Sequence, residues 1–147
     1  SAWTGPRAKP ELPWDYLPDI RALAERADVL ILAVPGGAAT DGMVDSAVFR
    51  ALGPRGVLVN VARGSVVDEA ALLDALENGT IAAAGLDVFA REPGLDPRFL
   101  TLDNVVLAPH SASLTYETRA ALVARILADI AAFRQGRPFL DAAAATG

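Results

Sequence analysis

Cysteine is missing from all 147 residues of the sequence. This excludes disulfides, thiolate nucleophiles and thiolate metal sites, and it fits a reducing compartment. The longest apolar run, Val29 to Val34, is too short to cross a bilayer, and no signal-peptide pattern opens the chain. A G-x-G-x-x-G phosphate-binding loop is also absent. We therefore expect a soluble, cytoplasmic protein with no membrane partner.

Basic residues are outnumbered by acidic ones, 13 against 18, which gives a net charge of −5. Such a chain has no basic face to neutralise phosphates, so we expect no nucleic-acid partner. Apolar residues, in contrast, make up 52% of the chain. This is a globular composition, and the length is sufficient for one domain with a substantial core.

Short apolar runs alternate with helical patterns along the chain. The run from Val29 to Val34 is apolar at every position, as expected of a parallel strand covered by helices on both faces. Further strands are predicted over residues 57–61, 81–88 and 105–108, helices over 19–27, 46–52, 68–78 and 115–135, and a loop over 5–18. This alternation predicts an α/β fold, a Rossmann-type doubly wound parallel sheet.

Polar side chains follow the predicted strands at their carboxyl ends. These residues are Thr40, Arg63, Asp87, Glu92 and His110, the only histidine. Each has an ordinary alternative, since Arg63 can be a surface arginine on a βα loop and His110 a histidine of the core. Because the carboxyl ends of parallel strands share one edge of the sheet, their convergence favours a functional site.

The grouping suits one kind of chemistry. Histidine exchanges a proton near neutral pH, and a neighbouring carboxylate favours its charged form and fixes its tautomer. Arginine presents a planar fork to a carboxylate and an adjacent carbonyl oxygen. Together they suit the reduction of a 2-oxo acid. No side chain donates a hydride, so a nicotinamide cofactor is required.

Three motifs in order give the chain a family resemblance. They are NVARGSVVD at residues 60–68, GLDVF at 85–89 with Glu92-Pro93, and NVVL at 104–107 with Pro109-His110. From about Trp3 to Pro138 the chain resembles the D-2-hydroxyacid dehydrogenase family. Residues 35–40 and 110–113 are most similar to its glyoxylate/hydroxypyruvate reductase branch.

The resemblance implies a role for each matching residue. Arg63 would bind the substrate carboxylate, and His110 would be the general acid–base with Glu92 as its partner. Asp87 would hold the nicotinamide end of the cofactor. The remaining cofactor-binding residues would be Thr4, Arg7, Val34, Pro35, Thr40, Val61, Ala62 and Ala112, joined by Arg63 and His110.

The chain also departs from the family pattern. The first strand, the glycine-rich loop and most of the substrate domain are absent, and no initiator Met precedes Ser1. We interpret the chain as a C-terminal fragment. Residues 1–110 would form a partial dinucleotide-binding domain, and residues 111–147 a long helix and tail that return to the substrate domain. Ala112 replaces a glycine that is usual in the family.

Cofactor choice depends on the segment after Trp3. Thr4, Arg7 and Lys9 precede the first acidic residue, Glu11. NAD-binding domains place an acid there, whereas cations suit a 2′-phosphate, so NADP is weakly preferred over NAD. The alternative is that Arg7 and Lys9 only solubilise a loop.

The leading hypothesis is therefore a homodimeric oxidoreductase that reduces glyoxylate, hydroxypyruvate or another small 2-oxo acid with NAD(P)H. A second hypothesis is a truncated, non-catalytic module for nucleotide binding or dimerisation. A third, a hydrolase using Ser111 or Ser113 with His110, is disfavoured because adjacent residues rarely reach the geometry of a nucleophile and its base, and no G-x-S-x-G motif occurs.

Overall fold

The computed structural model describes residues 1–139, which fall into two compact units that divide between His110 and Ser111. The first unit contains β1 (Ala2–Trp3), β2 (Asp15–Tyr16), α1 (Ile20–Arg26), β3 (Val29–Leu32), α2 (Ser46–Leu52), β4 (Val57–Asn60), η1 (Gly64–Val66), α3 (Glu69–Glu77), β5 (Ala83–Leu86), η2 (Pro97–Thr101) and β6 (Val105–Leu107). The second contains α4 (Tyr116–Arg134).

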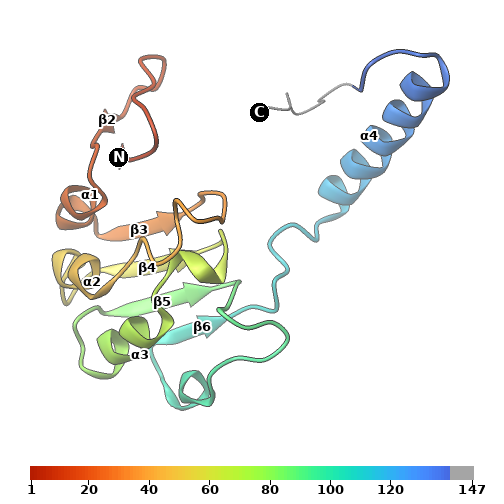
Figure 1. Cartoon of the computed structure of the whole chain (residues 1–147). Coiled ribbons are helices and arrows are strands. Elements are labelled where there is room, and N and C mark those ends of the chain that lie inside the picture. Colours follow the sequence, from red (N-terminus) through yellow and green to blue (C-terminus); the bar gives the residue numbers. More distant parts are fainter. Residues whose placement is uncertain (140–147) are drawn as a thin grey trace. The chain divides into compact units, whose positions relative to one another are not determined.

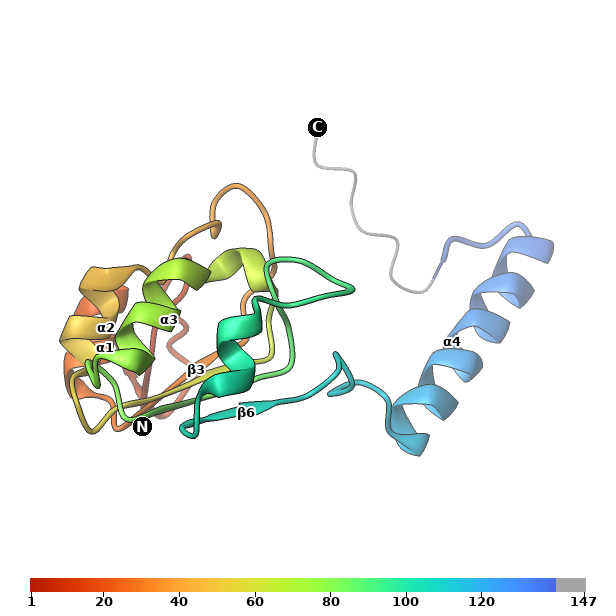
Figure 2. The ribbon, with the colours of Figure 1, turned by 90° about the horizontal axis from the view of Figure 1, so that it is seen from below.

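The first unit is built on a four-stranded sheet in the order β3-β4-β5-β6, in which every neighbouring pair is parallel. A separate two-stranded parallel sheet, β1-β2, lies beside it (Figure 1). The helices α1, α2 and α3 lie on one face of the larger sheet, as its edge-on view shows (Figure 2). The predicted α/β class with a parallel sheet is confirmed.

Aspartates set where the helices of this unit begin. Asp19 caps α1, Asp45 caps α2 and Asp68 caps α3, each accepting hydrogen bonds from backbone N–H groups in the first turn. Gly79, with φ of 67°, follows the end of α3 in the left-handed conformation that ends helices. The predicted helices are confirmed to within two residues at each end.

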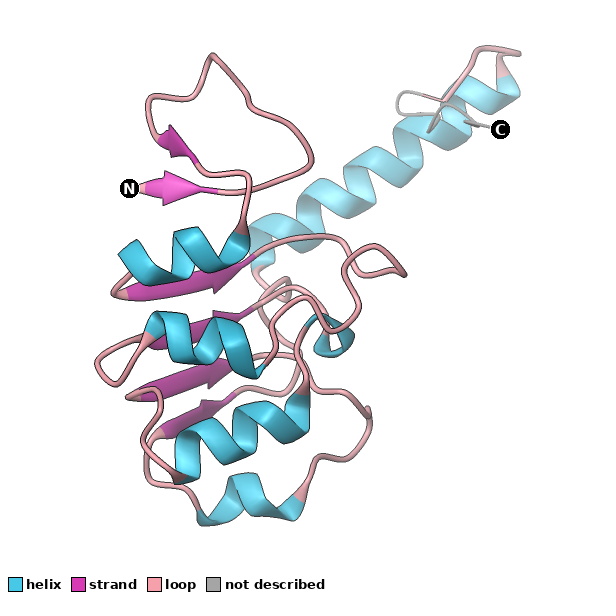
Figure 3. Cartoon of the chain, turned by 60° about the vertical axis from the view of Figure 1, so that its left-hand side comes forward, coloured by secondary structure: helices cyan, strands magenta, loops and turns pink. Residues whose placement is uncertain are grey.

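Alternate side chains of the strands form the core. Leu30, Leu32, Leu58, Ala84 and Leu86 are buried and belong to one hydrophobic cluster with residues of the three helices. The four strands run in the same direction beneath those helices (Figure 3). All four loops that leave their carboxyl ends therefore emerge at one edge of the sheet.

The opposite face of the sheet differs from the prediction. Val29 is 50% exposed, Ile31 62% and Val106 73%. Within residues 1–110, helices cover only one face of the sheet, so the expectation that helices cover both faces of β3 was wrong for this unit, and the strand ends at Leu32 rather than Val34. An unbroken apolar run shows that a strand suits burial on both faces, but residues 1–110 supply helices for only one.

The segment from Gly5 to Pro18 is not entirely a loop. Asp15 and Tyr16 form β2, which pairs with Ala2 and Trp3 of β1. The Trp3 and Tyr16 rings lie 5.0 Å apart, and the Leu17 N–H donates to the Trp3 carbonyl at 2.9 Å. A strand of two residues shows no periodicity, so only tertiary pairing defines it.

The second unit consists mainly of α4, which begins after the N-cap Thr115. The predicted helix is confirmed. Its apolar stripe is exposed at each position, namely Val123, Ile126, Leu127, Ile130 and Phe133. Among residues 1–139, no helix combines the length and apolarity that a membrane span needs.

Candidate active site

A cavity of about 710 Å³ lies where the loops after β3, β4, β5 and β6 leave the sheet. Its lining residues are Pro35, Gly36, Gly37, Asp41, Arg63, Gly64, Ser65, Phe89, Ala90, Glu92 and His110. Three of the polar residues predicted from the sequence, Arg63, Glu92 and His110, thus share one cavity.

Arg63 is positioned by the end of β4. Asn60, which is 1% exposed, accepts a hydrogen bond from the Ala62 N–H at 3.0 Å and donates to the Arg63 carbonyl at 3.1 Å. These two bonds fix the turn that carries the arginine. Its Nη1 donates to the Ala62 carbonyl at 2.6 Å, which holds the guanidinium against the loop.

Glycines allow the loops to approach one another. A Cβ on Gly36 would lie 2.8 Å from Cγ of Arg63. A Cβ on Gly64 would lie 2.5 Å from the Ala90 nitrogen and closer still to the Phe89 carbonyl. Real Cβ contacts are essentially never shorter than 3.0 Å. The Arg63 loop therefore packs directly against the loops after β3 and β5 because these positions lack side chains.

Glu92 and His110 form a hydrogen-bonded pair. Glu92 Oε2 lies 2.7 Å from His110 Nδ1, and Glu92 Oε1 accepts from the Phe89 N–H at 2.9 Å. The His110 bond lowers the pKa of Glu92 below its ordinary value, and the Phe89 N–H and the charge of Arg63 lower it further. An ionised carboxylate only accepts hydrogen bonds, so Nδ1 carries the proton of this bond. Nε2 is then the ring atom left to exchange a proton with a ligand.

The backbone of His110 is unusual. Among the described residues it is the only non-glycine with positive φ, at 54°. L-residues rarely adopt this conformation, and such strain is concentrated at functional sites. Here it occurs at the residue that bears the imidazole, directly after Pro109.

The structure places the other predicted residues around this cavity or away from it. Asp87 is 7% exposed directly after β5, and Pro35 lines the cavity. Thr40 does not line it, because its hydroxyl donates to the Pro35 and Gly37 carbonyls and closes its own turn.

The remaining predicted residues also fall outside this cavity. Ala62 is buried, whereas Val61 is 43% exposed. Thr4 and Val34 line a different cavity, Arg7 is exposed, and Ala112 belongs to the second unit.

Sequence reasoning missed two acidic residues. Asp41 lines the cavity in the turn after Thr40. Glu69 accepts from the Ala90 N–H at 2.9 Å and so attaches the loop of Glu92 to the first turn of α3. A glutamate in the first turn of a helix is already explained by its favourable interaction with the helix dipole, so the sequence gives no sign of this longer-range contact.

A cavity of about 710 Å³ has room for the nicotinamide end of a dinucleotide. Gly36 and Gly37 present backbone without side chains, and nothing lies within 4 Å of a Cβ on Gly37, so a ligand has close access there. Asp87 adds a buried carboxylate at the same edge. Within residues 1–139, no group of three or more His, Asp or Glu side chains is arranged to hold a metal ion.

Comparison with known families adds a decisive observation. Residues 6–112 match the family described as D-isomer specific 2-hydroxyacid dehydrogenase, NAD binding domain. The chain belongs to this family. The resemblance inferred from the three motifs of the 2-hydroxyacid dehydrogenases is thereby confirmed.

Individual relatives of this dehydrogenase domain agree. The chain is 49% identical over 132 residues to a 2-ketogluconate reductase of Gluconobacter oxydans, covering 90% of the chain and 43% of the relative. It is 40% identical to a glyoxylate/hydroxypyruvate reductase of Arabidopsis thaliana, covering 90% of the chain and 42% of that relative. The chain thus spans less than half the length of the curated relatives that it matches.

A solved structure shows the same fold. The NADPH-dependent glyoxylate/hydroxypyruvate reductase of Sinorhizobium meliloti, in complex with NADP and malonate, superposes with a TM-score of 0.86 at 46% identity. The match covers 90% of this chain and 42% of that one.

Proposed function

We propose that this chain supplies the acid–base half of an NAD(P)H-dependent reductase that acts on a small 2-oxo acid, glyoxylate or hydroxypyruvate being the first candidates. The observation that carries the proposal is the 2.7 Å bond between Glu92 and His110 in the cavity that Arg63 also lines. The names of the two reductases that act on glyoxylate and hydroxypyruvate support the substrate class.

The residues divide the work between binding and proton transfer. Arg63 binds the substrate carboxylate and the adjacent carbonyl oxygen with two parallel N–H donors. His110 donates the Nε2 proton to that oxygen, and Glu92 stabilises the ring in its charged form. Asp87, Pro35, Val61 and Ala62 would hold the nicotinamide cofactor, which supplies the hydride when bound. In the reverse direction His110 Nε2 takes the proton back.

NADP preference is part of the proposal. Thr4 and Arg7 follow β1, which ends at Trp3, and no acidic residue occurs before Glu11. The absence of an acid there favours a 2′-phosphate, and the Sinorhizobium relative was crystallised with NADP. A kcat/KM for NADPH that exceeds the value for NADH would support this preference. Equal values would remove it.

The assembly proposed from the sequence also needs a test. We propose a cytoplasmic homodimer in which the segment 111–147 returns to a substrate domain; residues 140–147 of this predicted segment lie outside the described residues. Analytical ultracentrifugation measures the mass in solution, and cell fractionation measures the location. A monomer at all concentrations would remove the proposed homodimer. Recovery of the protein outside the cytoplasm would remove the proposed location.

Turnover tests the central proposal. NADPH and NADH consumption would be measured with glyoxylate and hydroxypyruvate, both for the chain and for a version completed to the length of its relatives. In the active version, His110→Gln should lower kcat by about 10²–10⁴-fold, because general acid–base catalysis contributes that much. Arg63→Lys should mainly raise KM, since a point charge does not reproduce the planar fork.

The matched control for Arg63→Lys is Arg55→Lys, because Arg55 is exposed and lies outside the cavity. Normal turnover of the His110→Gln variant would refute the role of the imidazole.

The chain and its completed version also test the alternative hypothesis of a non-catalytic module. It predicts that the cofactor raises the melting temperature while neither version turns over.

A further inference from the structure

One charged residue of the active-site cavity has no part in the proposed binding of the 2-oxo acid or in the proton transfer. Asp41 lines the cavity that also contains Arg63 and His110, and it is exposed, so a ligand can reach it. Within the described part of the chain, its carboxylate has no hydrogen bond or ion pair. The other acid of this lining, Glu92, is already bonded to His110. The Asp41 carboxylate is therefore left to meet a ligand.

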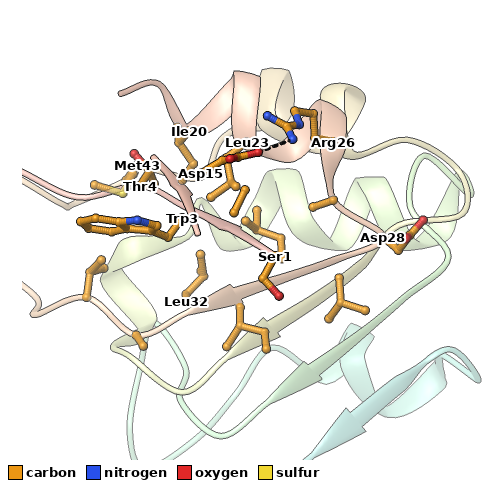
Figure 4. A pocket seen from close by; sticks show the side chains of 17 residues that line it. Ser1, Trp3, Thr4, Asp15, Ile20, Leu23, Arg26, Asp28, Leu32 and Met43 are labelled. Carbon is orange, nitrogen blue, oxygen red and sulfur yellow. Dashed lines mark hydrogen bonds and ion pairs between the residues drawn. The ribbon is translucent and has the colours of Figure 1, made fainter. Parts of the chain in front are cut away.

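A second cavity of the same unit shows the contrasting case. It has a volume of about 750 Å³, is lined by residues of β1, α1 and β3, and includes Asp15 in its lining (Figure 4). There the Asp15 carboxylate accepts a hydrogen bond from the Arg26 guanidinium at 2.9 Å, and Arg26 lines the same cavity. The charge of Asp15 is thus offset by a neighbouring cation, whereas the charge of Asp41 is not.

Backbone hydrogen bonds hold the position of Asp41. Its own N–H donates to the Gly37 carbonyl at 3.0 Å, and the next N–H, that of Gly42, donates to the Ser65 carbonyl at 2.8 Å. Ser65 lies two positions after Arg63 in the loop that carries the guanidinium. The loop of Asp41 is therefore fixed against the loop of Arg63, and the acid and the guanidinium keep their places in one cavity.

The charges of this cavity suit a ligand with one anionic end. Arg63 takes the carboxylate of a 2-oxo acid, and the described lining contains no lysine and no second arginine. A second carboxylate on the ligand would therefore meet the charge of Asp41 with no cation to offset the repulsion. A hydroxyl group, in contrast, donates a hydrogen bond to a carboxylate.

We infer that Asp41 is a specificity-determining residue, which favours 2-oxo acids with a neutral, hydroxylated tail over those with a second carboxylate. The tail is the part of the substrate beyond the carbonyl carbon. The inference rests on the proposed function, because it takes the substrate carboxylate to be bound by Arg63, and it narrows the substrate class of that site. Asp41 acts on the binding of the tail, whereas His110 acts on the proton.

Three non-reacting ligands with one headgroup test this inference. They are the N-ethyl, N-(2-hydroxyethyl) and N-carboxymethyl derivatives of oxamate, which differ only in the tail. Calorimetry with NADPH present measures the Kd of each ligand, both for the chain and for the version completed to the length of its relatives. The contribution of the shared headgroup cancels in the ratio of two Kd values.

The wild type should rank the three tails by their charge and their donors. The carboxymethyl ligand should bind about tenfold more weakly than the ethyl ligand, as expected for like charges about 8–10 Å apart near a protein surface. The hydroxyethyl ligand should bind about threefold more tightly than the ethyl ligand, because it adds one hydrogen bond. High salt should reduce the first ratio.

Variants assign these ratios to the charge of Asp41. Asp41→Asn keeps the size and removes the charge, so the carboxymethyl and ethyl ligands should bind within about twofold of each other. Asp41→Lys should reverse their order. The matched control is Asp103→Asn, which makes the same change at an exposed acid that precedes β6 and lies outside the cavity. It should keep the wild-type ratio.

The outcomes separate this inference from the proposed function. If the ethyl ligand binds and the ratio is the same in the wild type and in Asp41→Asn, this inference fails while the proposed function stands. Equal Kd values for the carboxymethyl and ethyl ligands in the wild type would overturn it as well. If none of the three ligands binds to either version, the proposed function fails and the inference fails with it.

Discussion

Replacing Gly64 with alanine perturbs the contact between the Arg63 loop and the Glu92 loop. The new Cβ would lie 2.5 Å from the Ala90 nitrogen, whereas ordinary contact begins near 3.4 Å. The Phe89 carbonyl lies closer still to the new Cβ, and neither neighbour is a flexible side chain, so the two backbones must separate by more than about 1 Å. Overpacking of this kind costs about 1–3 kcal/mol, and we expect the upper part of that range because the clash is with backbone.

Thermal unfolding followed by circular dichroism measures this effect. For a domain of this size, about 2–3 kcal/mol corresponds to a melting temperature lower by about 10 °C. Gly85→Ala is the matched control, because the nearest atom to its new Cβ is Cγ2 of Val59, 4.0 Å away. Gly85→Ala should melt at or above the wild-type temperature. A Gly64→Ala variant as stable as Gly85→Ala would refute the argument from loop contact.

Three further predictions concern charged side chains. His110→Gln should raise the pKa of Glu92 toward its ordinary value, as measured by carboxyl NMR titration, and an unchanged pKa would contradict the pairing. Because the pKa of Glu92 is lowered in the folded state, the stability from this bond is fully present at a pH above the ordinary pKa. It is lost as the pH falls through the lowered pKa. Glu69→Ala should speed exchange of the Ala90 amide by about tenfold, while Glu69→Gln, which keeps an acceptor oxygen, should not; equal rates in both would remove the proposed attachment. Arg98→Ala removes the ion pairs between η2 and α3 and should lower the melting temperature, with a loss that shrinks at high salt; a salt-independent loss would assign the effect to packing.

Features determined by local chemistry were predictable from the sequence. Asp19 and Asp68 cap the helices that follow them, because a side-chain acceptor satisfies N–H groups only two or three residues away. The convergence of Arg63, Glu92 and His110 was predictable for a different reason. Parallel strands deliver their carboxyl-end loops to one edge regardless of the details of each loop.

Features determined by distant contacts were not predictable. Glu69 and Ala90 are 21 residues apart, so their bond depends on how two loops pack. The pairing of Asp15 with Ala2 has no periodic signal because each strand contains two residues. The exposed face at Ile31 was missed because an apolar run specifies that a strand suits burial, while the covering must come from elsewhere.

The measurement that tests the central claim most directly follows the imidazole of His110, the only histidine of the chain, by NMR. Oxamate, a non-reacting analogue of a 2-oxo acid, would be titrated in the presence of NADPH. If Arg63, Glu92 and His110 form one substrate site, the imidazole resonances should shift saturably, and Arg63→Lys should weaken binding while Arg55→Lys does not. No shift in the wild type, or equal affinity in Arg63→Lys, would contradict the claim.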